Sequence, residues 1–281
     1  MKQYPAIDVR ADSSDLLLAL VDDFGPTAVE ERDAWVRIFF PTIAERDAAQ
    51  RALGPGFDVS AVEVDDEDWA RRSQENLKPI TVGRITVAPP WAAGVRSRFS
   101  PGDQPEGENR DLTPLTIVIL PSMGFGTGHH VTTRLCLAAL QTIDLTGRVV
   151  LDVGTGSGVL AIAADGLGAA RALGIDDDPD AIQSACDNLA LNPDVRHVTF
   201  ETIDLAARAL PDADVVTANL TGALLVRSAA ALLGAVRPGG TLILSGIQSH
   251  ERDEVRRAFA DAEVSWERDE DGWVGLAVKK R

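Results

Sequence analysis

A glycine-rich loop at residues 154–158 (GTGSG) has the composition of a cofactor-binding turn. Gly154 and Gly156 allow a tight turn and let a ligand approach the backbone, and the next helix is expected to begin at Ser157. Asp152, just upstream, can face the ammonium group of a methionine moiety. Dinucleotide-binding folds use a related loop, but the G-x-G-x-G spacing and Asp152 favour S-adenosylmethionine over a nicotinamide cofactor.

A second carboxylate, Asp176, lies at the end of the next expected strand, roughly 20 residues beyond the loop. In doubly wound folds a carboxylate at this point accepts hydrogen bonds from the two ribose hydroxyls of an adenosine. The alternative is helix capping, with Asp178 as the N-cap and Pro179 in the first helical position. The two roles are compatible, because Asp178 can cap the helix while Asp176 binds the ribose.

Asn219 follows the fourth strand of the expected sheet. Ligands of open α/β sheets lie beyond the carboxyl ends of the strands, so Asn219 is expected where a transferred methyl group meets its acceptor. An uncharged amide can orient an amine nucleophile there without bringing a second proton into the site. The alternative is that Asn219 only caps the following helix.

The most distinctive string of the chain, residues 124–133 (GFGTGHHVTT), stands just before a helix predicted over 134–143. Its glycines and hydroxyls suggest a loop that folds over a small polar ligand. The adjacent histidines, His129 and His130, do not predict a metal site, because neighbouring side chains rarely ligate one ion and no carboxylate or cysteine is close in sequence. For proton removal the candidates are His130 and bulk water.

The order of the predicted elements indicates two domains. Residues 1–64 read strand-helix-strand-strand-helix-strand, the pattern of a ferredoxin-like α+β domain, and residues 65–110 form a linker with an acidic helical stretch, a strand over 80–88 and a mobile excursion over 96–109. Residues 111–281 predict a doubly wound, Rossmann-like α/β domain that ends in an antiparallel hairpin. Its strands are expected at 149–153, 171–176, 198–203, 215–218, 241–245, 264–268 and 273–278.

The overall charge and composition limit the partners. The formal net charge of −16 is spread along the 281 residues, which argues against direct binding of nucleic acid. It is compatible with a basic protein substrate, or simply with an acidic surface. Two cysteines fit a reducing compartment. Without an apolar signal or membrane-spanning stretch, a cytoplasmic protein with no membrane contact is expected; the oligomeric state stays open.

Four stretches together resemble the ribosomal protein L11 methyltransferase (PrmA) family: 125–133, 152–158, Gly174-Ile175-Asp176 and Ala218-Asn219-Leu220. Residues 67–69 (EDW) and 88–91 (APPW) extend the resemblance into the linker. The string 125–133 is much more specific than the glycine motif, which all class I methyltransferases share.

That family joins a ferredoxin-like substrate-recognition domain to a class I methyltransferase domain and methylates lysine side-chain amines and the N-terminal amine of a ribosomal protein. The resemblance implies S-adenosyl-L-methionine as the methyl donor, no metal, and a ribosomal protein substrate, free or on the large subunit. The acceptor-side, catalytic candidates are Thr127 and Asn219. The candidate cofactor-binding residues are Phe125, Thr127, Thr133, Asp152, Gly154, Gly156, Asp176, Asn219 and Leu220.

The sequence departs from the family pattern at three places, and these departures leave the identity of the substrate more open than the type of reaction. Val131 stands where the family often has Pro, residues 219–222 (NLTG) replace Asn-Ile-Leu-Ala, and the excursion over 96–109 is longer than the usual connection. The alternatives are therefore methylation of lysines in another protein or of a small molecule. More distant ones are a nicotinamide oxidoreductase and a non-catalytic nucleotide-binding protein.

Overall fold

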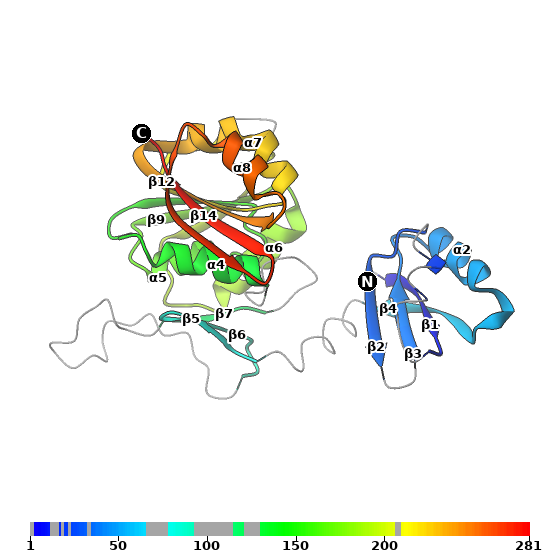
Figure 1. Cartoon of the computed structure of the whole chain (residues 1–281). Helices are drawn as coiled ribbons and strands as arrows, with labels where there is room; N and C mark the ends of the chain where they lie inside the picture. Colours follow the sequence, from blue (N-terminus) through cyan, green and yellow to red (C-terminus); the bar gives the residue numbers. More distant parts are fainter. Residues whose placement is uncertain are drawn as a thin grey trace. The chain divides into compact units, whose positions relative to one another are not determined.

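The structure is a computed structural model that describes residues 3–11, 17, 20–21, 24–32, 35–65, 78–92, 115–120, 130–205 and 209–281 (Figure 1). The chain divides into two compact units, Met1–Asn76 and Leu77–Arg281. Several predicted features lie outside the described residues, namely the acidic helical stretch, the excursion over 96–109, His129, and the candidate site residues Phe125 and Thr127.

The first unit contains a four-stranded antiparallel sheet with the order β2-β3-β1-β4. This order and the strand-helix alternation confirm the predicted ferredoxin-like domain, although little of its first helix is described. The strands are β1 (Gln3–Val9), β2 (Ala28–Arg32), β3 (Trp35–Phe39) and β4 (Val59–Asp65), and between β3 and β4 lie helix α2 (Ile43–Leu53) and the 3-10 turn η2 (Gly54–Gly56).

Side chains alternate between the two faces of this sheet. Ile7, Val9, Val36 and Ile38 point to one face, where they are buried against Ala49 and other helical residues. The residues between them in sequence, among them Asp8 and Arg37, belong to the opposite face. The first unit thus has its larger apolar core on the face of Ile7 and Ile38, while the opposite face combines polar side chains with a smaller apolar cluster of Ala6, Phe39 and Val64.

The second unit is built on a seven-stranded sheet with the order β10-β9-β8-β11-β12-β14-β13. The first five strands are parallel, and β14 runs antiparallel to both of its neighbours. All seven predicted strands are present: β8 (Val149–Val153), β9 (Arg171–Asp176), β10 (Val198–Thr202), β11 (Ala213–Asn219), β12 (Val236–Gln248), β13 (Glu263–Glu270) and β14 (Trp273–Lys279).

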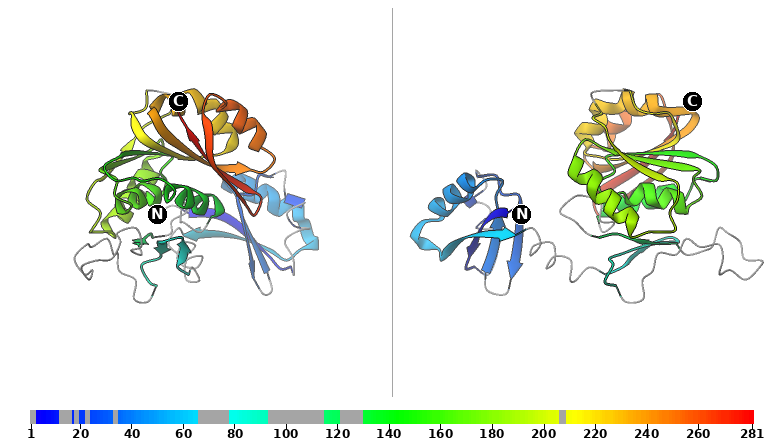
Figure 2. Two further views of the ribbon diagram at one scale, coloured as in Figure 1. Left: turned by 60° about the vertical axis from the view of Figure 1, so that its left-hand side comes forward. Right: turned by 180° about the vertical axis from the view of Figure 1, so that it is seen from behind.

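Helices cover both faces of this sheet (Figure 2). Helices α4 and α5 pack on one face around an apolar cluster, and α7 and α8 pack on the other around a second cluster. The helices are α4 (Val131–Leu140), α5 (Val159–Gly166), α6 (Pro179–Ala190), α7 (Gly222–Ala235) and α8 (Arg252–Ala258). Strand order reverses between β8 and β11, and such a switch point opens a crevice at the carboxyl ends of the strands.

The prediction of one strand over 80–88 is wrong. The segment forms a hairpin of β5 (Ile80–Val82) and β6 (Ile85–Ala88), and β6 pairs in parallel with β7 (Leu115–Val118). The chain reverses at Gly83, whose φ of 57° is unfavourable for other residues. The amide of Gln141 holds the turn, because it donates to the carbonyl of Val82 and accepts from the N–H of Arg84, each at 2.9 Å.

Two predicted helix starts are also wrong. Helix α4 begins at Val131 rather than at residue 134, because His130 acts as its N-cap and its side chain accepts from the N–H of Thr132. Helix α5 begins at Val159 rather than at Ser157, after Gly158 in the left-handed conformation. In the part of the chain that the structure describes, no helix combines the length and apolarity needed to cross a membrane.

Candidate functional site

The glycine-rich loop leaves β8 at the switch point of the seven-stranded sheet. Its glycines, Gly154, Gly156 and Gly158, have φ values of 69°, 53° and 81°, in the left-handed region that favours glycine. A Cβ at Gly154 would collide with the side chain of Leu220, and one at Gly158 would lie 2.7 Å from the ring of Phe200. The loop is therefore a cradle of bare backbone that no other residue type could form without rearrangement.

Asp152 lies at the base of this loop with 1% of its surface exposed. One of its carboxylate oxygens accepts from the hydroxyl of Thr155 and the other from the hydroxyl of Thr217, both at 2.6 Å. Burial raises the pKa of Asp152 to about 6, although the two hydroxyls oppose this shift. The carboxylate thus fastens the loop to β11, while its predicted contact with a methionine ammonium group stays a prediction.

Thr155 and Thr217, the two partners of Asp152, were not predicted from the sequence. Thr217 stands directly opposite Asp152 on the neighbouring strand, 65 residues along the chain. Only the register of β8 against β11 brings the two side chains together, so no local pattern could have indicated the pair. For Thr155 a signal existed, since a hydroxyl three residues after a buried carboxylate can turn back to it.

Asp176 ends β9 beside the loop. Its carboxylate accepts from the N–H of Gly156 at 3.0 Å and from the N–H of Asp178 at 3.2 Å. Partial burial raises its pKa, and these two backbone donors counteract the rise. A carboxylate has about four acceptor positions, so capacity remains for the hydroxyls of a ribose.

The capping role predicted for Asp178 is confirmed. Its side chain accepts from the N–H of Asp180 at 2.9 Å, and Pro179 is the first residue of α6. Helix capping, one of the two roles considered for this acidic stretch, thus belongs to Asp178 and leaves Asp176 available for the other. Asp178 caps the helix, and Asp176 lies at the strand end next to the glycine-rich loop.

Asn219 lies at the end of β11, and its Nδ2 donates to the hydroxyl of Thr133 at 3.5 Å. The alternative that Asn219 caps the next helix is wrong, because the N-cap of α7 is Thr221. Thr133, predicted as part of a loop, lies in the first turn of α4 and is 1% exposed. Leu220, the next residue, contacts the cradle at Gly154. These predicted site residues thus gather at one edge of the sheet.

His130 has a structural role at the start of α4. Its ring meets Trp273 edge-on with ring centroids 4.9 Å apart, and burial together with the charge of Arg134 lowers its pKa. Its Nδ1 accepts from the N–H of Thr132 at 3.4 Å and lies 2.8 Å from the hydroxyl of the same residue. No group of three or more His, Cys, Asp or Glu side chains that could hold a metal ion occurs among the described residues.

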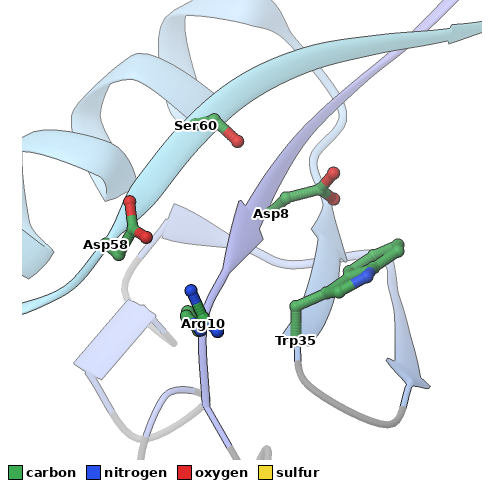
Figure 3. Close-up of a pocket in the computed structure, with 5 residues that line it drawn as sticks. All are labelled: Asp8, Arg10, Trp35, Asp58 and Ser60. Atoms are coloured by element: carbon green, nitrogen blue, oxygen red, sulfur yellow. The ribbon is translucent and has the colours of Figure 1, made fainter.

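A separate pocket lies in the first unit, on the face of its sheet opposite the apolar core (Figure 3). Asp8 is held by Arg37 through two hydrogen bonds of 2.6 and 2.7 Å, which raise the pKa of Arg37. The guanidinium of Arg37 also lies 4.8 Å from the ring centroid of Trp35. The lining residues are Asp8, Arg10, Trp35, Asp58 and Ser60.

The second unit has the features of a class I S-adenosylmethionine-dependent methyltransferase: parallel strands, a final antiparallel strand inserted into the sheet, a glycine cradle and an acidic residue after the second strand. The sequence profile of the family described as "Ribosomal protein L11 methyltransferase (PrmA)" matches residues 30–281. The chain belongs to the ribosomal protein L11 methyltransferase family.

Individual relatives agree with this assignment. The ribosomal protein L11 methyltransferase of Deinococcus radiodurans is 37% identical over 263 residues, covering 90% of this chain and 89% of the relative. That of Pseudomonas aeruginosa is 39% identical over 269 residues, covering 92% and 85%. The crystal structure of a ribosomal protein L11 methylase from Lactobacillus delbrueckii subsp. bulgaricus matches with a TM-score of 0.61 and 26% identity, covering 74% of this chain and all of the other.

The buried carboxylate of Asp152 gives the protein a defined pH dependence. Because its pKa is about 6 in the folded chain and 3.8 ordinarily, the stability that it contributes is present below pH ~4 and is lost as the pH rises through ~6. We expect the unfolding free energy of the wild type, relative to Asp152→Asn, to fall by about 3 kcal/mol across this range. Urea unfolding of both proteins at several pH values measures the difference, and a constant or rising difference would contradict it.

Replacing Asp176 tests the assignment of the ribose site. Asp176→Ala removes the acceptor predicted for two ribose hydroxyls, so we expect the Kd for S-adenosylhomocysteine to rise about 100-fold or more. The neighbouring Asp177 is exposed, so Asp177→Ala serves as the control that removes the same charge. Its Kd should stay within about 3-fold of the wild-type value. Calorimetry measures both values, with circular dichroism to check the fold. Normal affinity in Asp176→Ala would disprove the ribose assignment.

Proposed function

We propose that this chain transfers methyl groups from S-adenosylmethionine to amino groups of ribosomal protein L11, on lysine side chains, on the N-terminus or on both. The observation that carries this proposal is the Asn219–Thr133 contact beside the glycine cradle, in a chain whose relatives are named for that activity. The contact supports the proposal because the Asn219 amide lies at the carboxyl ends of the strands, where ligands of open α/β sheets bind.

The described residues fit the donor molecule. Gly154 and Gly156, both in the left-handed conformation, shape the backbone cradle, and Asp176 offers acceptors for a ribose next to it. When bound, S-adenosylmethionine supplies a methyl group activated by a sulfonium. Asp176 holds the adenosine end, Leu220 closes the cradle at Gly154, and Asn219 with Thr133 faces the acceptor. Phe125 and Thr127 are proposed to complete the site.

The amine must reach this site without its proton. A lysine amine has a pKa of ~10.4 and an α-amine ~8, so both are mostly charged at neutral pH. Removal from water favours the neutral form, and the Asn219 amide can orient it within about 3 to 3.5 Å of the methyl carbon. The nitrogen lone pair then forms the new N–C bond, the S–C electron pair remains on sulfur, and the extra proton leaves to water.

For the proton acceptor, water is preferred over His130. The Nδ1 atom of His130 is engaged at the start of α4, and the site needs no strong base once the amine is neutral. Orientation and desolvation therefore carry the rate enhancement in this proposal.

We propose that residues 1–64 recognise the protein substrate, that 65–110 connect the domains and that 111–281 catalyse the transfer. The sheet face of the first unit opposite α2, with the pocket around Trp35, is the candidate recognition surface. The net charge of −16 suits a basic ribosomal protein. A cytoplasmic location follows from such a substrate. Nucleic acid and membrane have no direct part in this proposal.

Transfer of labelled methyl groups tests the proposed substrate. Large ribosomal subunits from a strain that lacks the enzyme, incubated with the protein and methyl-labelled S-adenosylmethionine, should become labelled in L11. Asp176→Ala serves as the control that keeps the same surface but should give no label. Label in a protein other than L11 would favour the alternative that the enzyme methylates lysines of another protein. Label only in small molecules would reject the proposal.

Recognition by the first unit predicts a separable effect of Trp35. Trp35→Ala removes the aromatic wall of the pocket and the ring beneath Arg37, so we expect KM for the protein substrate to rise about 10-fold. The Kd for S-adenosylhomocysteine should stay unchanged. Steady-state methylation and calorimetry measure the two constants. An unchanged KM would show that this pocket does not contact the substrate.

A further inference from the structure

Asn188 and Asn192 of the second unit bind backbone groups on the outer side of β7, where a further strand could pair. Strand β7 is at the edge of the sheet β5-β6-β7, so alternate backbone groups point away from β6 and need other partners. The amide of Asn192 accepts from the N–H of Val118 at 2.9 Å and donates to its carbonyl at 2.7 Å. Two residues on, the N–H of Leu120 donates to Oδ1 of Asn188 at 2.8 Å.

Asn188 makes one contact that Asn192 lacks. Its Nδ2 donates to the carbonyl of Ser157 at 2.9 Å, inside the glycine-rich loop. One planar amide therefore joins the end of the β7 segment, at Leu120, to the loop at Ser157. Asn192 instead donates to the carbonyl of Asn188 itself at 2.7 Å.

We propose that Asn188 is a positioning residue of the methyltransferase site, which sets the glycine-rich loop relative to the β7 segment. The amide presents its donor and its acceptor at a fixed angle, so the distance between Leu120 and Ser157 is determined by one rigid group. The side chain is 1% exposed, and Ser157 is 2% exposed. In such buried surroundings the hydrogen bonds resist exchange with water.

The position of the loop matters because Asp176 contacts it on the other side. The N–H of Gly156 reaches Asp176 and the carbonyl of Ser157 reaches Asn188, at adjacent residues. Asn188 thus holds the loop from the α6 side while Asp176 meets it from β9. Loss of the Asn188 contact is expected to let the loop shift away from the carboxylate proposed to hold the ribose.

The alternative is that Asn188 only stabilises the fold, and Asn192 provides the matched control. Both asparagines are buried and lie four residues apart, Asn188 within α6 and Asn192 just beyond its end. Asn192 holds the outer edge of β7 at Val118, and Asn188 holds the segment after β7 at Leu120. Asn192→Ala loses three of the hydrogen bonds above and Asn188→Ala loses two. A purely structural role therefore predicts that Asn192→Ala does at least as much harm to every property.

Calorimetric titration of both full-length variants with S-adenosylhomocysteine separates the two possibilities. We expect Asn188→Ala to raise the Kd about 10-fold or more, and Asn192→Ala to raise it less than about 3-fold despite an equal or larger loss in Tm. Amide hydrogen exchange without ligand should accelerate in peptides covering the glycine-rich loop for Asn188→Ala only. If Asn188→Ala does not fold, Asn188→Ser, which is too short to span both partners, takes its place under the same criteria.

Equal losses of affinity in the two variants, losses that merely follow Tm, or normal affinity in the Asn188 variant would overturn the inference. The inference rests on the proposed use of the glycine-rich loop for the methyl donor. The wild type separates the two failures: if it does not bind S-adenosylhomocysteine, the proposed function fails. If it binds and the Asn188 variant behaves like the Asn192 variant, only the positioning role fails.

Discussion

The almost fully buried carboxylate of Asp152 fastens the glycine-rich loop to the centre of the seven-stranded sheet. Burying such a group is costly unless hydrogen bonds compensate, and the hydroxyls of Thr155 and Thr217 provide them. Because these two threonines come from the loop and from β11, the same interaction fixes the loop against the strand that carries Asn219. The predicted cofactor side and the predicted acceptor side of the site are thereby held in a fixed relative position.

The other parts of the site are arranged around this loop. Asp176 meets it from β9, Leu220 covers it from the end of β11, and Asn188 ties it to the β7 segment. Thr133 reaches Asn219 because α4 begins earlier than its sequence pattern suggested. Each contact joins segments distant in sequence, so the site exists only in the folded sheet, as expected at a topological switch point.

The sequence alone predicted those features that depend on residues close to one another in the chain. The glycine-rich loop, the strand end at Asp176 and the Asp178 cap could be predicted because glycine spacing, apolar runs and capping residues act over a few neighbours. Thr217, Asn188 and Asn192 escaped prediction because strand register and edge-strand pairing decide their roles, and one sequence reveals neither. The hairpin at Gly83 was overlooked because Gln141, more than 50 residues away, stabilises its turn. The family resemblance added the acceptor class, which no residue pattern by itself specified.

The loop, Asp176 and Asn219 are proposed to form one methyl-donor site. A crystal structure of the protein with S-adenosylhomocysteine tests it most directly. Both ribose hydroxyls should lie within hydrogen-bonding distance of the Asp176 carboxylate, and the sulfur should be directed toward Asn219. A ligand that leaves Asp176 bound only to Gly156 and Asp178, or whose sulfur lies away from Asn219, would contradict it.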